Sequence, residues 1–420
     1  MKLVFGFLVP VLLAAPLAAQ EPTQAPSPTP VRTTKLAENL YEIATFTDNP
    51  IGVKVLALVG PEGVLLVDSG TAEGAPAVRA ALDMLGAGPV RLIVNTHYHD
   101  DHTGGNAALG KGALVIAHDA VARRLTTGLA LLAPPPPGTV PALTFDHTLT
   151  LRFAGEEVRA VHRPDAHTDG DLTVQFVRAG VVAVGDLVFP DRFPFIDLDA
   201  GGTLAGYLAT LATLAGQYPE GTRFVAAHGA VYTAAQVASY SAALVAMDEK
   251  VRAALAAGAT LERMQRDRVL AGWPEWGGGF VTADRFIATL AAAERPAPAP
   301  SLPSVLDRLI PALVAGSGED AVRLYRTLKT QQPPAYTFPE RDLNRLGYAL
   351  LEGKRTGDAV AIFALNVEEN PKSWNAFDSL GEAYAAAGKR ELAIAFYTKS
   401  LELNPANDHA TLMLERLRAH

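Results

Sequence analysis

One short segment of the chain holds a high density of side chains that bind metal ions. Residues 95–102 read NTHYHDDH and contain three histidines, two aspartates and one asparagine. On an extended turn, side chains two residues apart point the same way, so His97 and His99 can reach one ion. Asp101 and His102 project differently and can serve an adjacent ion. The segment therefore predicts a metal site.

The composition limits which chemistry this site can use. The sequence contains no cysteine, which excludes disulfides, cysteine ligands and a thiol nucleophile. Imidazole and carboxylate remain, and zinc accepts both. The net charge is -8 and Lys and Arg form no cluster, which argues against a broad nucleic-acid interface. Hydrophobic residues make up 49% of the chain, enough to build folded cores.

Three further candidate ligands stand beside strand-like runs. His167 lies in AHTDGD just before such a run, Asp186 directly follows residues 181–185, and His228 directly follows residues 223–227. HYHDDH resembles the HxHxDH signature of the metallo-β-lactamase superfamily, and these three residues follow it in the family's order. The resemblance covers roughly residues 35–290.

The resemblance implies which residues share an ion. It implies one site of His97, His99 and His167, a second site of Asp101, His102 and His228, and Asp186 as a bridge between both. The implied cofactors are two Zn²⁺ ions, with iron or manganese as alternatives. Asp68 matches a family aspartate that orients a ligand histidine without touching metal. Three other histidines match no ligand position, and we expect them to be structural: His118, His147 and His162.

A two-zinc site implies hydrolysis by a metal-bound hydroxide, which is available near neutral pH. Asp101 is the natural catalytic residue to orient the hydroxide and carry a proton to the leaving group. No Gly-x-Ser-x-Gly motif is evident. We expect cleavage of a carbonyl-centred bond in a β-lactam, lactone, ester or thioester.

Other functions remain open at this point. The same metals could hydrolyse a phosphodiester or a sulfuric ester, or the chain could be an iron-dependent enzyme similar to a sulfur dioxygenase. A non-enzymatic alternative is a peptide-binding repeat protein. The expected partner is a small-molecule substrate, with no nucleic acid.

The loop after Asp186 bears on the substrate. Some lactonases of the superfamily carry a tyrosine three residues after this aspartate, where this chain has Phe189. Residues 190–202 then leave from the metal edge. Three apolar residues of this loop either form a substrate wall or pack the loop onto the sheet: Phe193, Phe195 and Ile196.

Alternating strand-like and helical runs must position these residues, and they argue for an α/β sandwich with helices covering the sheets. The resemblance implies the αββα form. The expected strands are 53–59, 64–68, 91–96, 113–117, 149–153, 158–162, 172–177, 181–185 and 223–227. The expected helices are 71–85, 119–127, 204–217 and 234–257.

Both ends of the chain carry segments of other kinds. Residues 1–19 have the pattern of a secretory signal peptide, with Lys2 before a short apolar run, so we expect a periplasmic or secreted protein with no stable membrane span after cleavage. A Pro-rich linker at 20–34 precedes the metallo-β-lactamase-like domain at 35–293. A second linker, 294–303, leads to the tail at 304–420.

The tail reads as helical repeats. Leu346 and Leu380, Ala359 and Ala393, and Pro371 and Pro405 are matched pairs, and each pair is separated by 34 residues. This period is typical of helix–turn–helix repeats of the tetratricopeptide type. Such a tail can bind a protein or peptide partner, or can pack on the enzyme domain.

Overall fold

A computed structural model describes residues 29–47, 51–294, 302–331, 334–405 and 407–419. The expected signal peptide and most of the first linker therefore lie outside the described residues. Among the described residues, no helix combines the length and apolarity needed to cross a bilayer.

Two sheets form the first part of the chain. The seven-stranded sheet has the order β1-β2-β3-β4-β5-β6-β7, and the six-stranded sheet has the order β13-β12-β11-β10-β9-β8. The strands of the first sheet are β1 Val31–Lys35, β2 Leu40–Thr45, β3 Val53–Gly60, β4 Gly63–Val67, β5 Val90–Val94, β6 Leu114–His118 and β7 Leu143–Phe145. The strands of the second sheet are β8 Thr148–Phe153, β9 Glu156–His162, β10 Leu172–Phe176, β11 Val181–Gly185, β12 Arg223–Ala226 and β13 Val231–Thr233.

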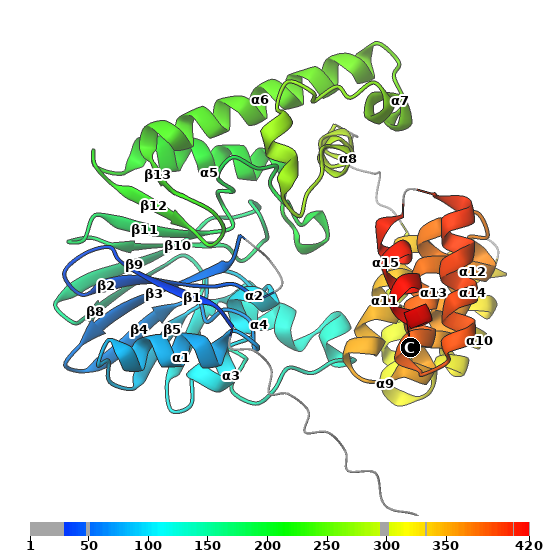
Figure 1. The fold of residues 1–420 in the computed structure, drawn as a ribbon, viewed down its shortest axis with the longest axis horizontal. Helices are drawn as coiled ribbons and strands as arrows, with labels where there is room; N and C mark the ends of the chain where they lie inside the picture. The colour runs from blue at the N-terminus through cyan, green and yellow to red at the C-terminus, as the bar shows by residue number, and fades with distance from the viewer. Residues whose placement is uncertain (1–28, 48–50, 295–301, 332–333, 406, 420) are drawn as a thin grey trace, which may run out of the picture.

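Helices cover the outer faces of both sheets (Figure 1). The helices of this part are α1 Ala75–Met84, α2 Asp100–Thr103, α3 Asn106–Leu109, α4 Asp119–Thr126, α5 Leu204–Gln217, α6 Ala234–Ala256, α7 Leu261–Arg266 and α8 Ala283–Ala293, with 3-10 turns η1 Gly128–Leu131, η2 Leu198–Ala200 and η3 Pro274–Gly278. Helix α1 packs on the first sheet, α5 and α6 lie over the second, and α8 packs beside α6 and α7. A third apolar layer lies between the sheets. The predicted αββα sandwich is confirmed.

The start of ordered structure differs from the prediction. We expect order from near Lys35, but β1 begins at Val31 and pairs antiparallel with β2 over five residue pairs. All five β1 side chains are exposed, so the strand has no apolar alternation and is held mainly by backbone hydrogen bonds to β2.

The described part of the tail consists of helices and their connections, with one isolated β-bridge between Ser304 and Thr337. Its helices are α9 Leu306–Ala315, α10 Gly318–Lys329, α11 Glu340–Glu352, α12 Thr356–Glu369, α13 Trp374–Ala386, α14 Arg390–Leu403 and α15 Asp408–Ala419. One contact recurs after 34 residues. A Cβ on Gly347 would lie 2.4 Å from the ring of Phe363, and a Cβ on Gly381 would lie 3.1 Å from the ring of Tyr397. Each glycine therefore allows a helix to approach an aromatic ring closely.

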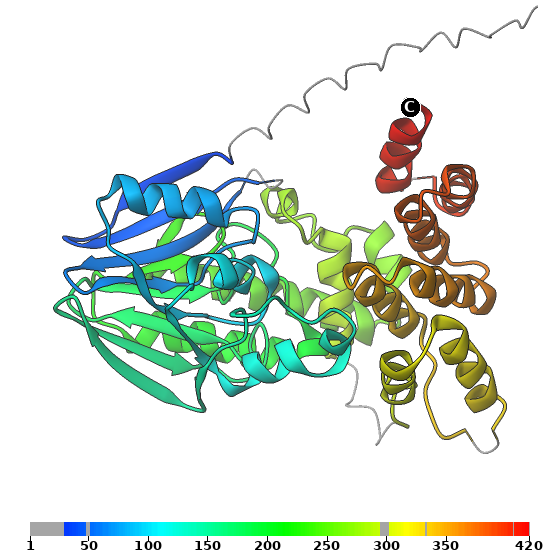
Figure 2. The same cartoon turned by 90° about the horizontal axis from the view of Figure 1, so that it is seen from below.

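The tail shares a hydrophobic core with the sandwich. Leu132, just after η1, is 4% exposed and belongs to the same buried cluster as Leu309 and Leu346 of the tail. Both views show the cyan η1 segment reaching the helical domain (Figure 1 and Figure 2). Arg341 and Arg345 of α11 also contact Asp199 at 3.5 and 3.4 Å. The tail is therefore packed on the sandwich domain.

Leu132→Ala should weaken this junction. We expect the free energy of unfolding to fall by about 2 kcal/mol or more, because the change leaves a cavity in a shared core. Leu131→Ala is the matched control, since Leu131 is 49% exposed on the same turn and its loss should stay within about 0.5 kcal/mol. Chemical denaturation measures both. Equal effects of the two variants would show that Leu132 does not join the domains.

Candidate metal centre

The topology brings the candidate ligands to one edge of the sandwich. Strands β11 and β12 are parallel neighbours, so Asp186 and His228, which follow them, leave at the same edge. Strand β10 is antiparallel to β11, so His167, which precedes β10, also lies there. The segment with His97 and His99 follows β5 of the other sheet, and Leu172 N donates to Thr96 O across the sandwich at 2.8 Å.

A first group consists of His97, His99 and His167. His97 Nε2 lies 2.9 Å from His99 Nδ1, His167 Nε2 lies 3.0 Å from His99 Nδ1, and His167 Nε2 lies 3.2 Å from His97 Nε2. Three ring nitrogens therefore face one point. A carboxylate oxygen of Asp186 completes the group.

A second group consists of Asp101, His102 and His228. His228 Nε2 lies 3.1 Å from Asp101 Oδ2, and His102 Nε2 lies 3.7 Å from Asp101 Oδ1. Asp186 stands between the two groups. Its Oδ1 lies 3.4 Å from His102 Nε2 and 3.6 Å from His228 Nε2, and its Oδ2 lies 3.8 Å from His167 Nε2. One carboxylate thus offers one oxygen to each group, and the seven candidate side chains lie together at this edge of the sandwich.

Hydrogen bonds fix the tautomers of His99 and His167. His167 Nδ1 lies 2.7 Å from the carbonyl oxygen of Phe195, which can only accept, so Nδ1 carries the proton. His99 Nε2 lies 3.1 Å from a carboxylate oxygen of Asp197, so Nε2 carries the proton. His167 Nε2 and His99 Nδ1 therefore present lone pairs to the first group.

Thr96 and Asp68 fix two more rings. The Thr96 hydroxyl donates to Asp68 Oδ2 at 2.8 Å, so it can accept from His97 Nδ1 at 3.2 Å. His102 Nδ1 donates to Asp68 Oδ2 at 2.8 Å. The expected role of Asp68 in orienting a histidine is therefore present in the structure, and His97 and His102 both turn Nε2 toward the groups.

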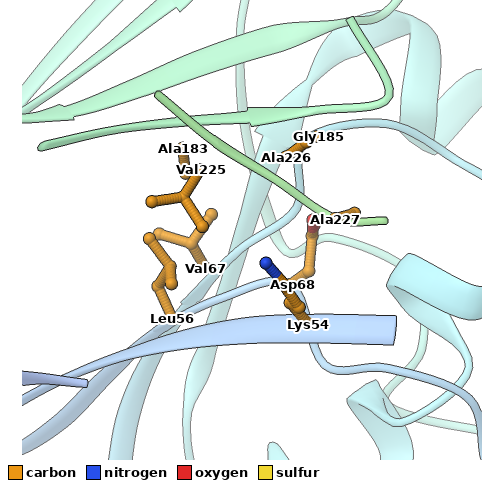
Figure 3. Close-up of a pocket in the computed structure, with 9 residues that line it drawn as sticks. All are labelled: Lys54, Leu56, Val67, Asp68, Ala183, Gly185, Val225, Ala226 and Ala227. Carbon is orange, nitrogen blue, oxygen red and sulfur yellow. The ribbon is translucent and has the colours of Figure 1, made fainter. Parts of the chain in front are cut away.

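The backbone of the first sheet holds His228. Its Nδ1 donates to the carbonyl oxygen of Gly52 at 2.9 Å, and Lys54 N donates to Ala227 O at 3.0 Å. A small cavity of about 10 Å³ is lined by residues of both sheets. Figure 3 shows Lys54 and Asp68 among the residues that line it. Lys54 is buried there in an ion pair with Glu42 at 3.1 Å.

This arrangement of lone pairs is unfavourable without a cation. Burial, together with the surrounding histidines, lowers the pKa of His97 well below its ordinary value, and burial and His99 lower the pKa of His167 to about 4. These rings are neutral at neutral pH, so their lone pairs repel one another. His102 Nε2 and Asp186 Oδ1 are buried, and no hydrogen-bond partner reaches them from the described residues. A positive ion in each group would satisfy all of these atoms.

The charges in the second group also favour a bound cation. Burial opposes a positive charge on His102, but Asp101, Asp68 and Asp186 outweigh it and raise the pKa of His102 well above its ordinary value. Burial would raise the pKa of Asp101, yet His102 and His228 lower it to about 2. The carboxylates are thus ionised and draw positive charge, and the residues present fit a pair of cations.

Asp197 is a site residue that the sequence did not reveal. It accepts a 2.7 Å hydrogen bond from the hydroxyl of Tyr98 as well as the bond from His99. It stands 98 residues after His99 in a loop that has no motif, so no spacing could have linked the two.

The histidines expected to be structural lie outside both groups. His118 and His162 stack on each other with ring centroids 3.6 Å apart, and His118 Nε2 contacts the carbonyl oxygen of Asp146 at 3.0 Å. His147 is exposed. None of the three joins a metal-binding group among the described residues.

A cavity of about 330 Å³ opens beside the two groups. His99, Asp101, Asp186 and His228 contribute to its wall, and the rest is mainly aromatic or apolar. Phe193 and Phe195 of the loop line the cavity, whereas Ile196 is 3% exposed and packs in the core. Phe193 lines the cavity and also packs in the core, where it is only 2% exposed. Phe280, beyond η3, adds a wall that the sequence did not suggest.

Comparisons with known proteins give one family match and likenesses to solved structures. Residues 49–228, which include all seven side chains, match the family model described as the metallo-beta-lactamase superfamily. A metallo-beta-lactamase from Pontibacter korlensis superimposes with a TM-score of 0.45 at 20% identity, covering 51% of this chain and 99% of that one. The DIM-1 metallo-beta-lactamase gives 0.44 at 16% identity, covering 51% and 97%. Residues 49–228 therefore match the metallo-β-lactamase superfamily, and this match and the site together support a metallo-hydrolase.

Proposed function

We propose that the chain is an exported, zinc-dependent hydrolase that cleaves a carbonyl-centred bond in a β-lactam, lactone, ester or thioester. The observation that carries the proposal is the convergence of five imidazole nitrogens and two carboxylates in two groups that share Asp186. Nitrogen and oxygen donors without sulfur suit zinc, and iron or manganese are the alternatives. Elemental analysis of the purified protein distinguishes them.

In this proposal His97, His99 and His167 would hold one ion, Asp101, His102 and His228 would hold the other, and Asp186 would offer one oxygen to each group. When bound, such ions supply a nucleophilic water near neutral pH and polarise the bond that is cut.

Asp101 is positioned to transfer a proton between the attacking water and the leaving group. It lines the cavity, and its side chain is 33% exposed, while Asp186 is almost fully buried. Its depressed pKa keeps it ionised, so it can accept a hydrogen bond from water and pass a proton toward a leaving group.

The cavity favours a carbonyl compound over a phosphodiester of a nucleic acid. Phe189, Phe195 and Phe280 line it, and Phe189 lies parallel to the ring of His228 at 6.1 Å. Polyanion binding needs clusters of cations, which an acidic chain of this composition lacks. Phe189 carries no hydroxyl to assist at the carbonyl, so that task would fall to the metal ions.

Export and the repeat type are further parts of the proposal. The charged start and short apolar run of residues 1–19, and the absence of cysteine, suit a periplasmic or secreted protein. Fusing these residues to a reporter enzyme that is active only outside the cytoplasm tests export.

The recurring glycine–aromatic contact supports a tetratricopeptide-like tail. Its shared core with Leu132 supports a role in packing on the enzyme domain.

Asp101→Asn and His97→Ala should each lower kcat/KM by about 100-fold or more, because each removes a group from the reacting centre. The assay is hydrolysis of a panel of lactam, lactone and thioester substrates, with circular dichroism to check the fold. Asp146→Asn and His147→Ala are matched controls, since both residues are exposed and remote from the groups. Full activity in Asp101→Asn or His97→Ala would refute the proposal.

Asp197→Asn should weaken zinc binding by about 10- to 100-fold at the first group. An amide donor facing His99 Nε2 would favour the wrong tautomer and place a proton on Nδ1. Asp199→Asn is the control, because Asp199 lies on the same turn and contacts only Arg341 and Arg345 among the described ion pairs. Competition with a chromophoric chelator measures the affinity, and unchanged affinity in Asp197→Asn would remove this residue from the site.

A further inference from the structure

A second cavity, of about 450 Å³, is bounded by residues of η3, of α8 and of the turn that follows α7. Figure 1 shows α7 and α8 near the end of α6, away from the two sheets. Among the described residues only Phe193 lines both this cavity and the cavity beside the metal groups. We propose that the second cavity binds a small zwitterion with an apolar side chain, such as a free apolar amino acid. This site goes beyond the proposed hydrolase function and does not depend on it.

The walls of the second cavity are mainly apolar. Leu270, Trp273 and Ile287 contribute to them. Trp273 is half-buried, and within the described part of the chain its indole has neither a hydrogen-bond partner nor an aromatic neighbour. The nearby Trp276, by contrast, stacks on Tyr240 with ring centroids 5.2 Å apart. The Trp273 indole therefore offers a flat apolar face and one donor to a ligand.

Arg268 lines the cavity from the turn that ends α7. Its φ is 49°, in the region that glycine adopts most easily. Arg268 N donates to Gln265 O at 3.0 Å and Val269 N donates to Met264 O at 3.2 Å, which are the two hydrogen bonds of a Schellman motif. The backbone thus fixes where the side chain leaves the turn. An arginine at a position that favours glycine indicates a use for its side chain.

Asp284 supplies the opposite charge from the first turn of α8. Gln265 Nε2 donates to the carbonyl oxygen of Asp284 at 3.0 Å and ties α7 to α8 beside the cavity. Neither the Arg268 guanidinium nor the Asp284 carboxylate forms an ion pair or a hydrogen bond with another described residue, and they do not pair with each other. The lining therefore presents one unpaired cation and one unpaired anion.

A zwitterion satisfies both charges at once. Its carboxylate accepts hydrogen bonds from the Arg268 guanidinium, its ammonium group donates to Asp284, and its apolar side chain lies against Trp273. A ligand with a single charge would leave one of the two groups unpaired. About 450 Å³ lies within the range of small-molecule sites and is too small for a folded partner.

Calorimetry with three small molecules tests this assignment on the full chain at neutral pH. L-Phenylalanine carries both charges, 3-phenylpropionate lacks the ammonium group, and 2-phenylethylamine lacks the carboxylate. We expect wild-type protein to bind L-phenylalanine about 5-fold or more tightly than either analogue, because each exposed ion pair contributes modestly.

Two variants separate the two charges. Arg268→Gln should remove the preference for L-phenylalanine over 2-phenylethylamine, and Asp284→Asn should remove the preference over 3-phenylpropionate. Arg266→Gln is the control for the first, since Arg266 is exposed at the end of α7 and does not line the cavity. Asp307→Asn is the control for the second, since Asp307 has the same position in α9 as Asp284 has in α8.

Three results would overturn the proposal. They are no binding of L-phenylalanine to folded wild-type protein, equal binding of the three molecules, or unchanged preferences in Arg268→Gln and Asp284→Asn. The last result also covers a ligand bound beside the metal groups, because Arg268 and Asp284 do not line that cavity. The measurement needs no hydrolysis, so its failure leaves the proposed function standing, and a failure of that function leaves this site standing.

Discussion

Crowding of imidazole nitrogens is the constraint on which the whole site depends. His97, His99 and His167 bring three ring nitrogens within 3.2 Å of one another, and the other ring nitrogen of each histidine faces its own hydrogen-bond partner. Such a cluster is stable only if the fold holds it or a cation fills it. The sandwich does the first, and the seven convergent donors form groups that fit metal ions, which would do the second.

The fold holds the rings through hydrogen bonds that reach between layers. His228 is oriented by Gly52 at the start of a strand in the opposite sheet, and His102 by Asp68 at the end of another. Gly185 is needed at this junction, because its φ is 50° and a Cβ would lie 2.6 Å from Thr96 Oγ1. The two sheets must therefore pack closely at this edge before the ligands can meet, so stability of the sandwich and integrity of the site are linked.

The sequence predicts the ligands better than it predicts what orients them. Strand β11, a buried apolar run, lies at its predicted bounds. Four strands are not predicted: the exposed edge strand β1, the three-residue strands β7 and β13, and β2, which is buried but whose sequence LYEIAT mixes polar with apolar residues. Several candidate ligand histidines and aspartates lie in a recognisable motif, HYHDDH. Their orienting partners include backbone carbonyls of Phe195 and Gly52, which any residue type can supply. The cavity walls also come from segments far apart in sequence, so Phe280 and Arg192 are recognised only in the fold.

Metal stoichiometry tests the central claim most directly. Purified protein is stripped with a chelator, reloaded with zinc, desalted and analysed for metal and protein together, alongside Asp186→Ala. Two equivalents of zinc per chain in the wild type, and a clear loss in the variant, are the results predicted by two groups sharing one carboxylate. Fewer than one equivalent bound to folded wild-type protein would contradict the account.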